Sequence, residues 1–181
     1  MEIQLHTFLF ADISGYSTLT ELEGDDAAAD IAIRFADEVA RIAPDHGADL
    51  VRRIGDGVLV HCVNAADAIE LGLRLQTALA SGPGERAFPQ IHAGIHTGPA
   101  VWRSGEWWGA TVNIAARVAA AAEAGQVLIT EATKRATRQP CGFELHDCGL
   151  RRMKNISAPV YVYSPCRHAP GLLPRAVLQT A

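Results

Sequence analysis

Two short apolar runs separated by Gly55-Asp56-Gly57 constrain the fold of this chain more than any other segment. Residues 50–54 and 58–63 are each long enough for a β-strand, and the glycine-flanked aspartate between them is typical of a tight turn. The sequence therefore predicts a hairpin with a carboxylate at its tip. Residues 3–12 form another strand-like apolar run, which ends on a second carboxylate, Asp12.

Further along the chain, apolar residues recur with helical or strand-like spacing. We expect a turn at residues 15–17, helices over 25–43, 65–80, 111–122 and 131–137, and strands over 90–101, 126–130, 142–147 and 158–163. The order β-α-β-β-α-β with additions predicts an α+β fold with a ferredoxin-like core. In that fold we expect the helices on one side of a mainly antiparallel sheet. Residues 1–166 are expected to form one domain and residues 167–181 a C-terminal tail on the surface.

The composition narrows the function classes. The chain has 181 residues, 49% of them apolar, which suits one well-buried domain. Its 16 basic and 20 acidic side chains give a net charge of -4, which argues against a nucleic-acid-binding surface. Neither a basic leader nor an apolar run of bilayer length is visible, so we expect a cytoplasmic protein without a membrane partner. Cys62, Cys141, Cys148 and Cys166 show no Cys-x-x-Cys spacing and are expected to be free thiols.

The two aspartates suggest a cation that carries phosphates. A carboxylate beside a buried strand is costly to desolvate unless something pairs with it. Gly15, shortly after Asp12, and the glycines on either side of Asp56 would let backbone amides approach a ligand. Mg²⁺ prefers one or two protein carboxylates together with phosphate oxygens. The alternative is that both aspartates are ordinary turn or cap residues.

Asn113 and Arg117 are four residues apart on a predicted helix and therefore share one face. An amide and a guanidinium aimed at one place suit charge that develops on a phosphoryl group. The alternative is a polar helix face that carries an ordinary surface arginine.

Five segments together resemble the class III nucleotidyl cyclases, in the order in which that family has them. The segments are Phe10–Ser17, Arg52–Gly57, Ala93–Gly98, Trp108–Arg117 and Leu150–Val160. The resemblance covers nearly all of residues 5–164. It implies attack of a ribose 3′-hydroxyl on the α-phosphate of a nucleoside triphosphate, which gives a 3′,5′-cyclic nucleotide and pyrophosphate.

The resemblance also implies residue roles and an assembly. Asp12 and Asp56, with the carbonyl of Ile13, would bind two Mg²⁺ or Mn²⁺ ions, and Asn113 and Arg117 would serve the transition state. Phosphate-binding positions correspond to Ser14, Gly15, Tyr16, Ser17, His92 and Lys154. In the family the aspartates come from one subunit and the asparagine and arginine from the other. A homodimer with two interfacial sites is therefore expected, and a monomer would be inactive.

The positions that read the base depart from the family pattern. Adenylate cyclases carry lysine and aspartate there, guanylate cyclases usually glutamate and cysteine, and this chain has Arg52 and Glu106. Adenine would offer N1 to Arg52 and its amino group to Glu106, so ATP fits. Cytosine offers two adjacent acceptors to the arginine fork and an amino group to the carboxylate, so CTP competes with ATP. Alternatively, Arg52 and Glu106 form a salt bridge with each other, and base selectivity is loose.

Other departures bear on the strength of the activity. His92 stands where many family members have a phosphate-binding arginine, so we expect weaker substrate binding. A zinc site at His92 and His96 is disfavoured because no third ligand is evident. Trp102, Trp107 and Trp108 are expected to fill a dimer interface or cap a core rather than stack on the base. The rival to an active enzyme is a cyclase-like domain that binds nucleotide without turning it over.

Overall fold

The computed structural model describes residues 4–80, 88–137 and 142–167. Its elements, in chain order, are β1 (Leu5–Ile13), α1 (Tyr16–Glu23), α2 (Asp25–Ile42), a 3₁₀ turn (Ala43–His46), β2 (Ala48–Ile54), β3 (Gly57–Cys62), α3 (Ala65–Ala80), β4 (Ile91–Pro99), β5 (Val101–Arg103), β6 (Glu106–Trp108), α4 (Ala110–Ala119), β7 (Val127–Thr130), α5 (Glu131–Ala136), β8 (Phe143–Arg151) and β9 (Val160–Arg167).

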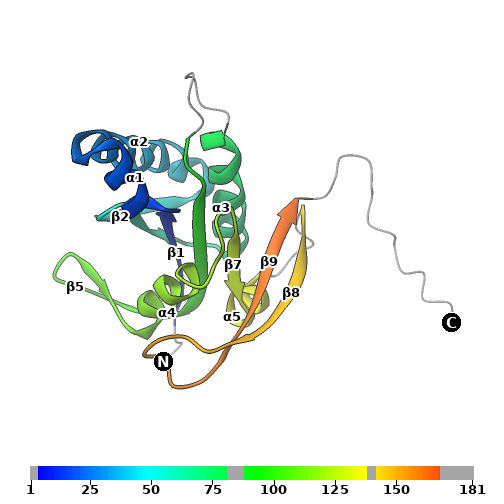
Figure 1. Cartoon of the computed structure of the whole chain (residues 1–181). Helices are drawn as coiled ribbons and strands as arrows, with labels where there is room; N and C mark the ends of the chain where they lie inside the picture. The colour runs from blue at the N-terminus through cyan, green and yellow to red at the C-terminus, as the bar shows by residue number, and fades with distance from the viewer. Residues whose placement is uncertain (1–3, 81–87, 138–141, 168–181) are drawn as a thin grey trace, which may run out of the picture.

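One seven-stranded sheet organises the molecule, with strand order β2-β3-β1-β4-β7-β9-β8 (Figure 1). β1 lies between β3 and β4 and is antiparallel to both, and β2 is antiparallel to β3. Helices α1 and α2 connect β1 to β2, and α3 connects β3 to β4. This is the predicted ferredoxin-like core, and the predicted α+β class is confirmed. The pairing of β4 with β7 is parallel, and the other pairs of the sheet are antiparallel.

The helices cover both faces of the sheet, so the expectation of a one-sided arrangement was wrong. Alternate residues of a strand point to opposite faces, and in β1 both Phe8 and Leu9 are completely buried. Leu9 belongs to the main core, which includes Phe35 of α2 and residues of α3. Phe8 belongs to a smaller core on the other face, together with Ala115 of α4. A strand that is apolar on both faces needs cover on both, and α4 supplies the second layer.

Gly94 in β4 sets how closely α4 approaches the sheet. A Cβ at this position would lie 2.0 Å from the backbone nitrogen of Ala119 and 2.5 Å from the carbonyl carbon of Val118. Any side chain at residue 94 would therefore push the helix away. The contact therefore sets the distance between the sheet and the residues on the outer side of α4.

Four element predictions need correction. Residues 16–23 form helix α1, although a turn was expected at 15–17, because Gly15 turns the chain with φ of 73° and the helix begins directly after it. The strand predicted over 90–101 ends at Pro99, where the missing N–H cannot extend a ladder. Residues 101–108 instead form the β5–β6 hairpin, which projects from the body in Figure 1. Strands β8 and β9 also end later than expected, at Arg151 and Arg167.

The predicted tail is not part of this description, since residues 168–181 lie outside the described residues. Within the described ranges, no helix combines the length and the apolar character needed to cross a bilayer.

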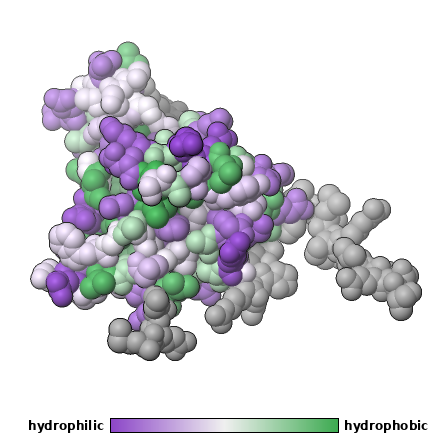
Figure 2. Space-filling view, turned by 90° about the horizontal axis from the view of Figure 1, so that it is seen from below, coloured by the Kyte–Doolittle hydropathy of each residue, from purple (hydrophilic) through white to green (hydrophobic). Residues whose placement is uncertain are grey.

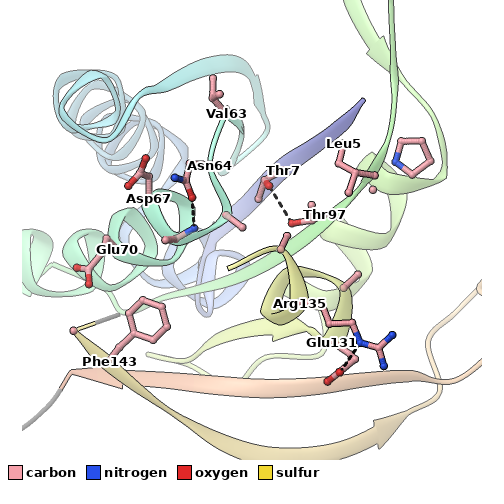
Figure 3. Close-up of a pocket in the computed structure, with 17 residues that line it drawn as sticks. Leu5, Thr7, Val63, Asn64, Asp67, Glu70, Thr97, Glu131, Arg135 and Phe143 are labelled. Carbon is pink, nitrogen blue, oxygen red and sulfur yellow. Dashed lines mark hydrogen bonds and ion pairs between the residues drawn. The ribbon is translucent and has the colours of Figure 1, made fainter. Parts of the chain in front are cut away.

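A buried network of polar side chains joins β1, β4 and β7. The hydroxyls of Thr7 and Thr97 lie 3.0 Å apart (Figure 3), and His96 Nδ1 lies 2.8 Å from the hydroxyl of Thr130. Thr130 also accepts a hydrogen bond from the backbone N–H of Thr133, which caps α5. Burial lowers the pKa of His96 to about 4.

Replacing Gly94 with alanine tests the packing of α4. Because the new Cβ would overlap backbone atoms, we expect Gly94→Ala to lower the free energy of unfolding by roughly 3 kcal/mol or more, measured by urea denaturation. Gly142→Ala is the matched control, since its Cβ would meet nothing closer than 3.9 Å. Equal stability of the two variants would contradict the proposed role of Gly94.

The burial of His96 predicts a loss of stability in acid. The folded protein keeps His96 neutral down to about pH 4, whereas the unfolded chain takes up the proton near pH 6.5. The unfolded state therefore binds more protons between these values, and stability falls as the pH drops from 6.5 towards 4. The full effect is at most about 3 kcal/mol. His96→Asn should flatten this part of the profile of unfolding free energy against pH. An unchanged slope in His96→Asn would refute the assignment.

Candidate active site

Asp12 and Asp56 lie side by side at one end of the sheet. Asp12 stands near the end of β1, opposite Gly57 of β3 and His92 of β4. Asp56 occupies the turn between β2 and β3, and its side chain is within hydrogen-bonding reach of Asp12. Gly57 leaves room for this contact, because a Cβ there would lie 3.0 Å from Oδ1 of Asp12. The structure thus brings together the two carboxylates that the sequence singled out.

The electrostatics of this pair favour a cation. Burial, the hydrogen bond to Asp56 and the negative charge of Asp56 together raise the pKa of Asp12 to about 7. The backbone N–H of Ile13 donates to Oδ1 of Asp12 at 3.2 Å and opposes this shift only partly. Two neighbouring carboxylates in such a setting need either a shared proton or a positive ion. The oxygen-only donor set fits a hard ion such as Mg²⁺ or Mn²⁺.

A small polar group borders the aspartates. The Ser14 hydroxyl lies 3.0 Å from His92 Nδ1, and the Ser14 backbone N–H donates to the carbonyl of Gln90 at 2.8 Å. Burial lowers the pKa of His92, although the charge of Asp56 works in the opposite direction. Helix α1 begins at Tyr16, shortly after Asp12 in the chain, and the amides of its first turn have no partner inside the helix. Gln90 is a supporting residue that the sequence analysis missed.

Arg52 and Glu106 form the salt bridge that the sequence analysis left open. Arg52 Nη1 lies 3.2 Å from Glu106 Oε1, and the two side chains are 46% and 45% exposed. A β-bulge between Leu50 and Arg52 shifts the register of β2 here. The bulge places Val51 in the smaller core beneath α4 and leaves Arg52 directed at β6.

Helix α4 presents Asn113 and Arg117 on the side away from the sheet. Asn113 is exposed and Arg117 is partly buried. The start of α4 is tied down by the Thr111 hydroxyl, which donates to the carbonyl of Pro99 at 2.6 Å. Within the described ranges, no hydrogen bond or ion pair involves Asn113 or Arg117. Both side chains are therefore available to a ligand.

Lys154 lies in the connection between β8 and β9, which passes beneath α4 in Figure 1. The preceding residue, Met153, is 8% exposed and packs against Val118 of α4. Asn155 follows with φ of 61°, a left-handed conformation that asparagine tolerates and that lets the backbone turn sharply. The exposed Lys154 is thus held near α4 by a buried neighbour. Met153 was not among the predicted residues, although an apolar residue directly before a loop lysine indicates such an anchor.

The predicted site residues form two separate groups in one chain. The first contains the residues at the ends of β1, β3 and β4 and at the start of α1: Asp12, Ile13, Ser14, Gly15, Tyr16, Ser17, Asp56 and His92. The second contains Arg52, Glu106, Asn113, Arg117 and Lys154. Among the described residues, no hydrogen bond or ion pair joins the aspartate pair to Asn113, Arg117 or Lys154. We call these two groups the first and the second half-site.

The three tryptophans have different environments. Trp107 stacks on His61, with ring centroids 4.5 Å apart, and also contacts Phe8. It therefore caps the smaller core, which is one of the two roles expected for the tryptophans. Trp102 and Trp108 on the β5–β6 hairpin are 55% and 56% exposed. Seen from below, the surface is a mosaic of apolar and polar residues (Figure 2).

An open groove of about 1150 Å³ lies away from both half-sites. It is lined by residues from the start of β1, the end of β4, α3 and α5, including Thr7, Asp67 and Arg135 (Figure 3). None of the predicted site residues lines it. Its Glu131 and Arg135 already pair with each other. Size alone therefore does not make this groove the reactive site, and the paired carboxylates remain the better candidate.

Comparison with known proteins agrees with this geometry. Residues 2–163 match the family of adenylate and guanylate cyclase catalytic domains. A pH-sensitive adenylate cyclase of Mycobacterium tuberculosis is 30% identical over 166 residues, which are 90% of this chain and 41% of that protein. A putative adenylate cyclase of Rhizobium meliloti is 29% identical over 165 residues, 89% of this chain and 28% of that protein. The chain thus spans less than half the length of these relatives.

Solved structures give the same result for the fold. The adenylyl cyclase CyaB of P. aeruginosa superposes with a TM-score of 0.75 at 25% identity, covering 95% of this chain and 100% of that one. The catalytic core of a rhodopsin-guanylyl cyclase with converted specificity, in complex with ATPαS, reaches a TM-score of 0.80 at 22% identity, covering 92% of this chain and 97% of that one. The chain belongs to the family of class III adenylate and guanylate cyclase catalytic domains.

Proposed function

We propose that this chain is an active nucleotidyl cyclase that converts a nucleoside triphosphate, ATP in the first place, into a 3′,5′-cyclic nucleotide and pyrophosphate. The observation that carries the proposal is the contact between Asp12 and Asp56. Two carboxylates held in contact beside a buried strand favour a divalent ion, and the first turn of α1 can accept phosphate oxygens next to it. We place the activity in the cytoplasm, where the cyclic product would act as a signal.

The proposed metal ions are Mg²⁺ or Mn²⁺, two per site, held by Asp12, Asp56 and the carbonyl of Ile13. When bound, they would lower the pKa of the ribose 3′-hydroxyl and neutralise the leaving pyrophosphate. Ser14, Gly15, Tyr16 and Ser17 would bind phosphate oxygens through hydroxyls and backbone amides. His92 would add a hydrogen bond rather than a full positive charge, because burial keeps its pKa below the ordinary value.

The second half-site would act on the reacting phosphate and the sugar. Arg117 would meet the negative charge that builds up on the α-phosphate, and Asn113 would orient the ribose. Lys154 would hold the triphosphate from the β8–β9 connection. Because all three lack intrachain partners among the described residues, their donors need not be released from other bonds.

A homodimer would combine the half-sites. Each active site would take its aspartates from one chain and Asn113, Arg117 and Lys154 from the partner chain, which gives two equivalent sites. The exposed Trp102 and Trp108 of the β5–β6 hairpin supply aromatic area for such an interface. One structural neighbour, from Blastocladiella emersonii, is described as a non-canonical dimeric guanylyl cyclase domain, and two from Trypanosoma brucei are described as adenylate cyclases in their monomeric state.

Base selection would rest on Arg52 and Glu106. Their ion pair joins two half-exposed side chains, and such pairs contribute about 1 kcal/mol or less. A base that offers an acceptor to Arg52 and an amino group to Glu106 would therefore replace the pair at little cost. Adenine and cytosine both satisfy this pattern, and the shorter cytosine suits the larger side chains. ATP is favoured by the adenylate cyclase relatives, and CTP is its main competitor.

The second candidate function is a cyclase-like domain that binds nucleotide with little or no turnover. The observation that favours it is His92, which stands at a phosphate-binding position with a lowered pKa and hence little positive charge at neutral pH.

Incubation with each of the four nucleoside triphosphates and Mn²⁺, followed by chromatography of the products, tests the proposed reaction and its substrate. We expect cyclic AMP, with cyclic CMP as the principal second product, and no product after metal chelation. Arg52→Lys with Glu106→Asp should shift the ratio towards cyclic AMP. An inactive wild-type protein that still binds ATP would favour the binding-domain alternative.

Mixing two inactive variants tests the shared site. Asp56→Asn should abolish activity through the first half-site, and Arg117→Ala should abolish it through the second. Random exchange of subunits in an equal mixture restores one intact site in half of the dimers, so activity should recover to about a quarter of wild type. Sedimentation and circular dichroism serve as controls for assembly and folding. No recovery, with subunit exchange demonstrated by labelled chains, would contradict an interfacial site.

A further inference from the structure

Three side chains of types that can bind a metal ion lie together where β8 begins and β9 ends, away from the loop that connects the two strands. Glu144 and Cys166 are directly opposite each other in the β8–β9 ladder, and His146 lies two residues after Glu144. All three side chains therefore point to one face of the sheet. One potential ligand atom from each lies within 4.8 Å of the others, and His146 Nε2 is 3.2 Å from Cys166 Sγ.

We propose that Glu144, His146 and Cys166 form a binding site for a zinc-class divalent ion, separate from the metal site of the aspartates. Zn²⁺ is bound tetrahedrally by nitrogen at about 2.0 Å and sulfur at about 2.3 Å, which puts these two ligands roughly 3.5 Å apart. The observed separation of 3.2 Å is close to that spacing. An ion could thus enter with small side-chain movements, and water would complete the fourth position.

The ligand types select the ion. A thiolate and an imidazole favour zinc and similar transition metals, whereas Mg²⁺ takes oxygen ligands. The Asp12 and Asp56 site has the opposite preference, because its predicted donors are all oxygens. A charged residue on an edge strand such as β8 also guards against aggregation, which would explain Glu144 alone. It would not explain a cysteine and a histidine directed at the same point.

Cys148 provides an internal comparison. It lies on the same strand as Glu144 and His146, but its thiol donates to the backbone carbonyl of His146 at 3.6 Å. It does not belong to the group of converging ligand atoms. The proposed site therefore uses the thiol of Cys166, and the thiol of Cys148 on the same hairpin takes no part in it.

Occupation of this site would cross-link β8 to β9. These strands frame the connection that carries Lys154, and Met153 ties that connection to α4. An ion bridging the two strands would slow their separation. The inference rests on the ligand geometry alone and does not depend on cyclase activity.

Zinc titration of the metal-free protein, without a histidine tag and with excess Mg²⁺ to occupy the aspartates, tests the proposal. Calorimetry should give one Zn²⁺ per chain, and Co²⁺ should produce a thiolate charge-transfer absorption band. Cys166→Ser and His146→Ala should each weaken binding by roughly tenfold or more. Cys148→Ser should bind as wild type. Hydrogen exchange of β8 and β9 amides should slow on addition of zinc.

The proposal would be overturned by absence of zinc binding to the wild-type chain, or by binding that is unchanged in Cys166→Ser and in His146→Ala. Loss of binding in Asp56→Asn alone would assign the zinc to the aspartates and also reject the site. The four substituted residues, His146, Cys148, Cys166 and Asp56, lie near the surface or in a turn. Unfolding curves of each variant show whether folding is intact. The measured quantity is metal affinity, so a cyclase that proves inactive leaves this test unaffected.

Discussion

The contact between α4 and β4 is the constraint on which the second half-site depends. Gly94 lets the backbone of α4 approach the sheet so closely that a single methyl group would overlap the helix. The positions of Asn113 and Arg117 on α4 depend on that contact. Met153 packs against the same helix and so places Lys154 near it. Three polar side chains from two distant segments are thus positioned by one close approach of backbone to backbone. Small residues at such a contact are a structural requirement of the site as much as its charged groups are.

The two faces of β1 explain why one domain can carry both half-sites. Residues facing α2 and α3 form the main core, whereas Asp12, Phe8 and Phe10 share the face that α4 covers only in part. The apolar members of that face hold α4, and the polar member at its end remains accessible. Because β1 is paired with a strand on each side, its end is a fixed part of the sheet, and Asp12 at that end lies within hydrogen-bonding reach of Asp56.

Much of this arrangement was predictable, because it follows from local patterns. The Gly-Asp-Gly hairpin, the period of the helices and the shared helix face of Asn113 and Arg117 all depend on neighbours in sequence. The features that were missed depend on tertiary contacts. Helix α1 has a weakly amphipathic, threonine-containing sequence and is recognisable mainly by the turn at Gly15. The bulge at Val51 and the layer formed by α4 exist because apolar residues distant in sequence must be covered.

The pairing of Arg52 with Glu106 has a consequence for how the proposed base preference could change. Each charge in the free chain is balanced by the other, and the pair is about half exposed to water. Loss of either partner would leave an unpaired charge in contact with solvent, which costs the folded state about 1 kcal/mol or less. A lineage can therefore replace the two residues one at a time without passing through an unstable protein. In the proposed enzyme, base preference could therefore change through Arg52 and Glu106 while Asp12 and Asp56 stay unchanged.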